Sequence, residues 1–326
     1  MTRSPRFRRI SLALVGLAVA FAGASASAQT WPTKPIRLVV PFSPGGANDL
    51  MARAAAEGAS KVLGQQVIVD NKPGAGTTLG AEIVARSAPD GYTFLVSAAG
   101  VISNSMIKRK MPYKDEDLVP VAMIALAPSV VVAPAGAPYK NLKEFVEASK
   151  KSSTGFHWGT AGTGSTPHFV EGLLQTKYGA KLDVVPYKSG AESITAVLGS
   201  QIEATSEASI VVLPYIKSGK LVALADTWTQ RISAYPDLTT AVEQGFPDIQ
   251  IAHWAGVHAP RGTPDAILDK MAAAVDAAMK DPAISARLKA VGIEPIGGTR
   301  ASFIKFTGEE RARLGAVVKA TGMVED

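Results

Sequence analysis

The chain has 326 residues, of which 34 are Lys or Arg and 28 are Asp or Glu, and it contains no cysteine. The missing cysteine excludes disulfides, thiolate metal sites and a lipoprotein anchor. Four of the basic residues lie within the first nine positions, and removing them leaves 30 basic against 28 acidic residues. This near-neutral balance, with no basic stripe among aromatic residues, argues against a nucleic-acid partner.

The first 28 residues have the pattern of a cleavable export signal. A basic start is followed by an apolar stretch at 10–23 and by the small-residue sequence ASA at 26–28. We expect residues 1–28 to be removed, so that the mature protein begins at Gln29 and is soluble in the periplasm. A membrane anchor is the alternative, but the apolar stretch is shorter than the ~20 residues that span a bilayer.

Strand-like and helical segments alternate in the first part of the mature chain. Strands are expected at 36–42, 65–70 and 92–99, and helices at 49–63 and 79–87. This alternation predicts βαβ units, in which helices cover parallel sheets.

A second alternating series follows an apolar strand at 129–134. Its expected strands are at 156–160, 182–187, 202–207 and 221–225, and its helices at 141–151, from about 167, at 191–198 and at 211–217. The last long amphipathic helix is expected at 264–281 and would pack on the first series.

Two extended apolar segments, 129–134 and 249–260, both end in Ala-Pro. We interpret them as paired crossings between two lobes. Lobe 1 would then be discontinuous, comprising 29–130 and 251–326, and lobe 2 would comprise 131–250.

Glycine-rich loops lie where expected strands give way to helices. The first is FSPGGA at 42–47, and the second is GTAGTGSTPHF at 159–169. Backbone N–H groups at such a helix start can bind a phosphate, form a catalytic nest or hold a carboxylate. The second loop lacks the P-loop and G-x-S-x-G patterns, and one loop per lobe favours a shared anion site over two ordinary caps. A third loop, NKPGAGTTLG at 71–80, departs from the dinucleotide fingerprint and is interpreted as a structural turn.

The titratable residues give few further signals. None of the four histidines, His157, His168, His253 and His258, lies in a metal-ligand motif, so no metal site is expected. His168 could donate to a ligand or cap its own helix. Glu309 and Glu310 are expected to be solvated on a polar helical stretch. Glu207 shares one strand face with Glu203 and could meet a cationic ligand group, unless this strand lies at the surface.

Several long motifs extend these observations over essentially the whole mature chain. In order they are WPTKPIRLVVPFSPGGANDLMAR, VIVDNKPGAGTTLGAEIVARSAPDGYTFLV, GTGSTPHFVEGLL, VPYKSGAESITAVLGSQIE and APRGTP. The series resembles the Bug solute receptors of tripartite tricarboxylate transporters. The resemblance implies a type II periplasmic binding protein fold, an α/β fold with two lobes joined by a two-segment hinge and the ligand in the cleft between them. It also implies delivery to membrane components of a transporter, with no cofactor.

The resemblance further implies which residues contact the ligand. Backbone donors would come from the first glycine loop, and Glu207 falls where amino-acid-binding members carry an acid that meets the ligand ammonium. Asp49 is expected to cap its helix, since two negative groups would repel. The expected ligand-binding residues are Phe42, Ser43, Pro44, Gly45, Gly46, Ala47, Ser97, Thr163, Gly164, Ser165, Thr166, His168, Tyr187 and Glu207.

The leading hypothesis is therefore a monomeric receptor, not an enzyme, for a small organic anion. The anion could be a dicarboxylate, a tricarboxylate, an aromatic acid or an acidic amino acid. Two alternatives stay open. One is a secreted hydrolase or lyase that uses Ser165 and His168, although no third group orients them. The other is a sensory partner that presents its ligand to a membrane kinase.

Overall fold

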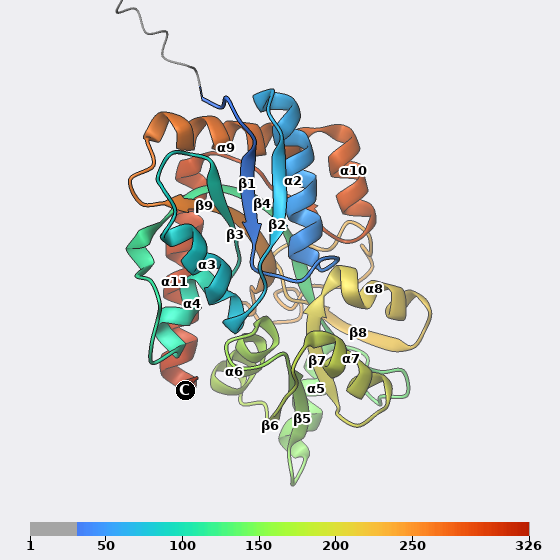
Figure 1. Ribbon diagram of the computed structural model, residues 1–326. Coiled ribbons are helices and arrows are strands. Elements are labelled where there is room, and N and C mark those ends of the chain that lie inside the picture. The colour runs from blue at the N-terminus through green and yellow to red at the C-terminus, as the bar shows by residue number, and fades with distance from the viewer. Residues whose placement is uncertain (1–30, 326) are drawn as a thin grey trace, which may run out of the picture.

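The computed structural model describes residues 31–325. The predicted signal peptide and the expected start at Gln29 lie outside the described residues. The chain forms two lobes, upper and lower in Figure 1, that meet along one long strand. Within the described residues no helix is both long and apolar enough to cross a membrane.

Lobe 1, the upper lobe in Figure 1, is built from both ends of the described chain. Its elements are β1 (Ile36–Val40), α2 (Ala47–Leu63), β2 (Val67–Asn71), α3 (Thr78–Ala85), β3 (Thr93–Ser97), α4 (Gly100–Ile107), β9 (Ala252–Pro260), α9 (Asp265–Lys280), α10 (Pro282–Ala290) and the short β10 (Glu294–Pro295). Two single-turn 3₁₀ helices, η1 (Ala75–Thr77) and η2 (Asp115–Asp117), belong to its loops.

Lobe 2 holds the middle of the chain. Its elements are α5 (Leu142–Lys151), β5 (Phe156–Thr160), α6 (Thr166–Tyr178), β6 (Leu182–Pro186), α7 (Gly190–Leu198), β7 (Ala204–Ala208), α8 (Ser209–Lys217) and β8 (Leu221–Asp226). Most segments expected from the sequence are present, with ends shifted by a few residues.

The 17-residue strand β4 (Leu118–Pro134) joins the two lobes. Along the main path the strand order is β2-β1-β3-β9-β4-β7-β5-β6. The first part of β4 pairs antiparallel with β9 as far as Pro128, and from Ser129 onward it pairs antiparallel with β7. The parallel pairs predicted from the two alternating series are present, β1 with β2 and β3, and β5 with β6 and β7. The sheet as a whole is mixed, because the long strands β4 and β9 pair antiparallel with their neighbours.

Thr227 ties the chain together where β4 passes between the lobes. Its N–H donates to the carbonyl oxygen of Ser129 at 2.8 Å, and it accepts from the N–H of Ile251 at 2.8 Å. Its hydroxyl lies 2.8 Å from the Ser129 carbonyl oxygen and 2.5 Å from that of Ile251. Thr227 thus links the segment at Ser129, where β4 enters lobe 2, to the segment at Ile251, where the chain returns to lobe 1. It does so through both its backbone and its hydroxyl.

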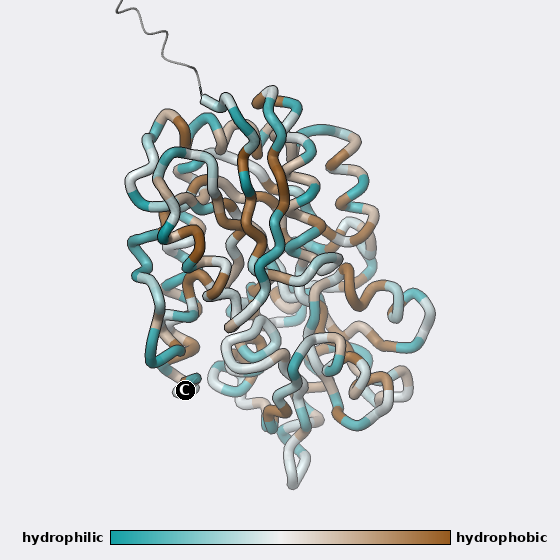
Figure 2. Tube along the Cα trace, viewed as in Figure 1, coloured by the Kyte–Doolittle hydropathy of each residue, from teal (hydrophilic) through white to brown (hydrophobic). Residues whose placement is uncertain are grey.

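Buried apolar side chains line the strands of both lobes. In Figure 2 the hydrophobic residues, coloured brown, run along the strands of the upper lobe. Small residues let two helices of lobe 1 approach closely. A Cβ on Gly58 of α2 would lie 2.3 Å from the Cβ of Ala278 in α9, so only glycine fits there. The expected helix at 264–281 thus packs on the first series through α2.

The C-terminal helix α11 (Arg300–Thr321) contains the polar helical stretch expected around Glu309 and Glu310, but its length and its packing were not expected from the sequence. Its apolar periodicity is weak because it contacts several elements rather than one sheet face. The prediction that Glu310 is solvated is wrong, since the residue is 2% exposed. It accepts from the indole N–H of Trp254 at 3.3 Å and pairs with Arg313.

Candidate functional site

The helices that follow the parallel strands begin where the two lobes meet. In lobe 1, β1 leads to α2 and β3 to α4, while in lobe 2, β5, β6 and β7 lead to α6, α7 and α8. In Figure 1 the loop between β1 and α2 lies at the end of lobe 1 that is turned toward lobe 2. Ligands of α/β sheets bind beyond the carboxyl ends of the strands, and helix N-termini there favour anions.

The loop 43–47 presents bare backbone at the start of α2. Residues 43–46 are exposed, and the N-cap residue Gly46 supplies no side-chain hydrogen bond. Within the described part of the chain, the N–H groups of Ala47, Asn48 and Asp49 have no acceptor. Gly45 has a φ of +86°, which other residues rarely adopt. The loop therefore offers several donors from one helix turn to an anion.

Asp49 holds this loop in place from behind. Its carboxylate accepts from the Gly45 N–H at 2.9 Å, from the Asn71 amide at 2.8 Å and from the Arg53 guanidinium at 2.9 Å. The residue is only 1% exposed. Burial alone would raise the pKa of Asp49, but these hydrogen bonds outweigh it and hold the pKa below its ordinary value. Asp49 thus stabilises the loop and faces away from solvent.

Two amide side chains complete the frame around the start of α2. Asn71, the last residue of β2, also donates to the Phe42 carbonyl oxygen at 3.0 Å. Asn48 donates to the Trp254 carbonyl oxygen of β9 at 3.0 Å. The aromatic ring of Phe42 is half-buried against the lobe 1 core. Sequence reasoning missed both asparagines, although Asn71 stands directly after an expected strand.

The second glycine loop, 161–166, is held by neutral groups. The Ser165 hydroxyl donates to the Gly162 carbonyl oxygen at 2.7 Å and accepts from the Ala161 N–H at 3.2 Å. The N–H of Gly164 donates to Nδ1 of His168 at 3.3 Å. Thr163 is exposed and Thr166 is half-buried. His168 therefore supports the loop, and burial lowers its pKa.

This second loop touches the opposite lobe. A Cβ on Gly164 would lie 2.5 Å from Cδ1 of Ile107, at the end of α4. Gly164 also has a φ of +71°, so a side chain is excluded on both grounds. The contact brings the expected lobe 2 loop against a helix of lobe 1.

Glu207 is a buried acid with no cationic partner in the described chain. It is 7% exposed, and its one hydrogen bond is a long one, 3.4 Å, from the N–H of Ala208. Burial raises the pKa of Glu207 to about 7, and that bond opposes the rise. The carboxylate lies over Gly190 at the start of α7, where an added Cβ would come within 2.1 Å of Oε1. Glycine at that position makes room for the acid.

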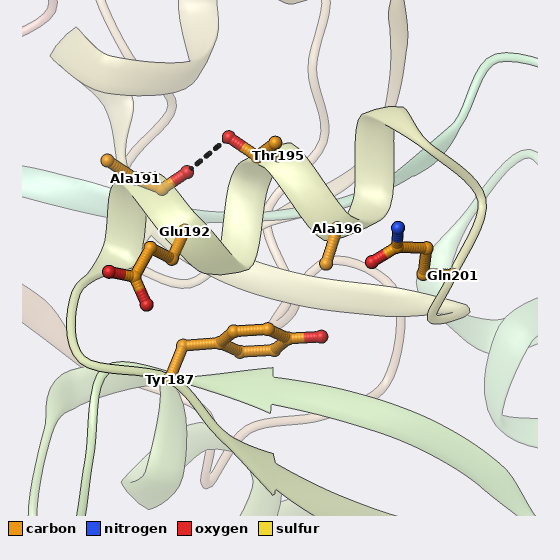
Figure 3. A pocket seen from close by; sticks show the side chains of 6 residues that line it. All are labelled: Tyr187, Ala191, Glu192, Thr195, Ala196 and Gln201. Atoms are coloured by element: carbon orange, nitrogen blue, oxygen red, sulfur yellow. Dashed lines mark hydrogen bonds between the residues drawn. The ribbon is translucent and has the colours of Figure 1, made fainter.

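The remaining expected residues are Ser97 and Tyr187. The hydroxyl of Ser97 is buried, 2.7 Å from Nδ1 of His258, and donates to the Gly256 carbonyl oxygen at 3.1 Å. Figure 3 shows the ring of Tyr187 beneath α7, with its hydroxyl directed toward the Gln201 side of a pocket of about 360 Å³. The Ser97 hydroxyl is thus engaged within lobe 1, whereas the Tyr187 N–H donates to the carbonyl oxygen of Thr160, directly before loop 161–166, at 3.0 Å.

The structure bears on the alternative in which Ser165 and His168 act together in catalysis. The Ser165 hydroxyl and the His168 imidazole are not hydrogen-bonded to each other, so the pair lacks the nucleophile–base contact that acyl transfer needs. Among residues 31–325 there is no group of three or more His, Cys, Asp or Glu side chains that could hold a metal ion. What the site does offer is backbone donors at the start of α2, the exposed Thr163 on the second loop and one buried acid.

The two-lobe α/β fold, with helix N-termini gathered at the junction, defines a type II periplasmic binding protein. Residues 51–323 match the model of the tripartite tricarboxylate transporter family receptor. The chain belongs to this family of solute-binding receptors, the Bug-type receptors.

Individual relatives agree over nearly the full length. Protein BugT of Bordetella pertussis is 34% identical over 316 residues, which cover 95% of this chain and 97% of the relative. The structure of Rpa4515 from R. palustris with adipate has 30% identity and a TM-score of 0.80, covering 90% of this chain and 98% of that one. MatC from Rhodopseudomonas palustris, with bound malate, has 30% identity and a TM-score of 0.76, covering 88% and 100%.

Proposed function

We propose that the protein binds a small organic carboxylate between loops 43–47 and 161–166 and delivers it to the membrane components of a tripartite tricarboxylate transporter. The observation that carries the proposal is the exposed loop 43–46, which leads into the start of α2, where the N–H groups of Ala47, Asn48 and Asp49 have no acceptor in the described chain. Such donors stabilise an anion without an arginine, because partial charges from helix starts add at one place.

The neutral character of the donors suits a receptor that must release its ligand. A salt bridge to the ligand would be strong and slow to break, whereas hydrogen bonds to backbone N–H groups can be exchanged for water when the lobes separate. Structures of two relatives are named with adipate and with malate. Both are small dicarboxylic acids, and we propose the same chemical class here.

Glu207 narrows the class further. An unpaired buried carboxylate beside a purely anionic ligand is unfavourable. If Glu207 contacts the ligand, the ligand carries a donor or a cation opposite its first carboxylate. An amino group, a hydroxyl or a second acid bound in its protonated form would meet this requirement. Hydroxylated acids and acidic amino acids are therefore favoured over plain diacids.

The proposal includes the setting in which the receptor works. The mature protein, starting at Gln29, would be a periplasmic monomer, with lobe 1 comprising 29–130 and 251–326 and lobe 2 comprising 131–250. Presentation of the ligand to a membrane sensor kinase is the second candidate, since the same closed form could be recognised by either partner. A pull-down with the membrane components of each system, with and without ligand, separates the two.

The direct experiment is calorimetric titration of the mature protein with malate, adipate, succinate and aspartate. Binding of at least one acid without turnover, followed by mass spectrometry of the recovered acid, supports the receptor. Glu207→Gln should weaken aspartate by roughly 2–5 kcal/mol, because a buried charge pair is broken, and should leave succinate unchanged or tighter. An equal response of both ligands would place Glu207 outside the ligand contacts.

A further inference from the structure

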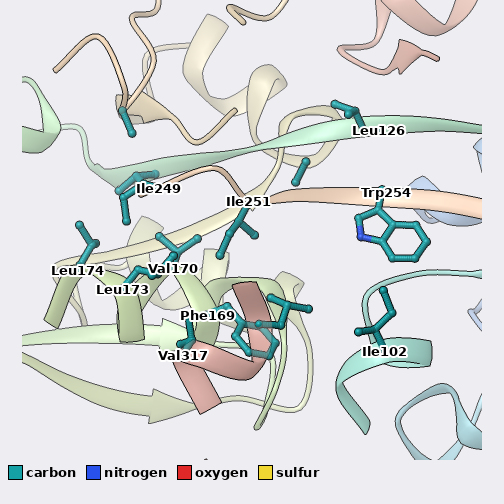
Figure 4. Packing of buried hydrophobic residues seen from close by; sticks show 14 of the residues in the cluster. Ile102, Leu126, Phe169, Val170, Leu173, Leu174, Ile249, Ile251, Trp254 and Val317 are labelled. Atoms are coloured by element: carbon teal, nitrogen blue, oxygen red, sulfur yellow. The ribbon is translucent and has the colours of Figure 1, made fainter. Parts of the chain in front are cut away.

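The C-terminal helix α11 contacts helix α4 of lobe 1 and helix α6 of lobe 2. On the lobe 1 side, a Cβ on Gly315 would lie 3.6 Å from Sδ of Met106 in α4. On the lobe 2 side, α11 packs against α6, and Figure 4 shows Val317 among Phe169, Val170, Leu173 and Leu174 of α6. The end of α4, at Ile107, touches loop 161–166, and α6 begins directly after that loop.

The tail after α11 strengthens its hold on α4. The N–H of Glu325 donates to the Ile107 carbonyl oxygen at 2.9 Å. The Glu325 carboxylate pairs with Lys108 at 2.7 Å. Ile107 is also the residue that touches the lobe 2 loop at Gly164. The end of the chain thus fixes the part of α4 on which loop 161–166 rests.

The contact with α6 depends on a single glycine. A Cβ on Gly172 would lie 2.9 Å from Cγ2 of Thr321, 3.0 Å from Cγ1 of Val317 and 3.2 Å from Cε of Met323. Thr321 and Val317 are β-branched, and their side chains have little rotamer freedom on a helix. Any larger residue at 172 must therefore displace α6 and α11 relative to each other.

We propose that Gly172 is a positioning residue: its close approach to α11 sets where the start of α6, with loop 161–166, stands relative to lobe 1. A rigid helix transmits a displacement at its middle to its end. Gly172 is seven positions along α6 from its N-cap residue Ser165, about 10 Å at 1.5 Å per residue. The effect on ligand binding rests on the proposed function, whereas the effect on lobe geometry does not.

The test uses the absence of native cysteine in the chain. Spin labels at the exposed Lys61→Cys and Lys143→Cys report the separation of the lobes by pulsed electron resonance. In the ligand-free protein, Gly172→Val should shift or broaden the distance distribution. The second-site change Val317→Ala removes one of the two facing β-branched side chains and should move the distribution back toward that of the wild type. Gly308→Val is the matched control, because Gly308 lies on α11 with nothing within 4 Å of an added Cβ.

The same variants are titrated with malate and adipate. Gly172→Val should bind on the order of tenfold more weakly, within the range of couplings between distant sites, and the double variant should recover. If Gly172→Val does not fold, Gly172→Ala is measured in its place, with Thr321→Ser as the second-site change. A folded Gly172 variant with the wild-type distance distribution would overturn the inference. Failure of the wild type to bind any acid would contradict the proposed function instead, because the distances are measured without ligand.

Discussion

The two glycine loops have similar sequences but are held in different ways. Loop 43–47 is anchored by the charged carboxylate of Asp49, which is itself satisfied by three donors. Loop 161–166 is anchored by the hydroxyl of Ser165 and the imidazole of His168, both within its own segment. The first loop thus depends on the lobe 1 framework, and the second depends mainly on itself.

The buried acids Asp49 of lobe 1 and Glu207 of lobe 2 also differ in how many donors surround them. Asp49 has cationic and neutral donors around it, and its pKa is lowered. Glu207 accepts one hydrogen bond, a long one from the N–H of the next residue, and burial raises its pKa to about 7. Lobe 1 thus uses its acid for structure, whereas the acid of lobe 2 has no cationic partner among the described residues. Each prediction below tests one side of this contrast.

The largest effect is expected for Asp49→Ala. The change leaves the Gly45 N–H and the Asn71 amide without the carboxylate that accepts from them. It also removes the buried negative charge that pairs with the Arg53 guanidinium. We expect a loss of roughly 3–4 kcal/mol in the free energy of unfolding at pH 7, measured by urea denaturation. Because the pKa of Asp49 is lowered from 3.8, its stabilisation is present above that value and is lost as the pH falls below it.

A comparable loss for Asp49→Ala at pH 7 and at pH 2.5 would show that the charge is unimportant to the loop. The exposed Glu116→Ala is a suitable control, since this residue lies on the surface of lobe 1 and has no hydrogen bond from its side chain in the described chain.

Glu207→Gln should raise the free energy of unfolding, whereas Asp49→Ala should lower it. The folded pKa is raised from 4.5 to about 7, so ionisation favours the unfolded state between these values. The loss of stability caused by ionising the buried Glu207 is absent below pH 4.5 and grows as the pH rises. It is complete above pH 7, where it reaches about 3 kcal/mol. The variant should therefore be more stable than wild type at pH 8 and equal to it near pH 4.

Thermal unfolding of both proteins across this pH range measures the difference. A variant that is less stable than wild type at pH 8 would mean that the ionised acid has a stabilising partner, against the contrast drawn with Asp49.

The smallest effect is expected for Ser165→Ala. The change removes one neutral hydroxyl that bridges the Ala161 N–H and the Gly162 carbonyl oxygen. We expect a loss of about 1 kcal/mol, with little dependence on pH between 5 and 8, in contrast to the pH-dependent loss at Asp49. A loss as large as that of Asp49→Ala would show that loop 161–166 is anchored as strongly as its counterpart.

Much of this architecture could be predicted from local patterns. The strand-turn-helix order around both glycine loops follows from apolar runs broken by Pro and Gly, which act over a few residues. The burial of Glu207 could not be inferred in that way, since it depends on Gly190 of helix α7, which leaves space for the carboxylate. The role of Asn71 likewise depends on the distance between β2 and the β1 loop in space.

The C-terminal helix shows the same limit. Its sequence reads as polar because only a few of its residues, such as Leu314 and Val317, are buried. Glu310 was expected in solvent, and its partner Trp254 lies on a strand 56 residues earlier. Contacts of this kind are decided by tertiary packing, which sequence periodicity does not report.

The most direct measurement is calorimetric titration of Gly46→Val beside wild type, with malate, adipate, succinate and aspartate as ligands. The backbone at Gly46 has a φ of −78°, and the only atom within 4 Å of an added Cβ is the Ser43 carbonyl oxygen at 3.7 Å, so the folded chain accommodates the side chain. We predict that wild type binds at least one acid and that the variant, unchanged in stability, loses on the order of 2 kcal/mol of binding free energy. Equal affinity of the two proteins would contradict the claim that the exposed start of α2 holds the carboxylate.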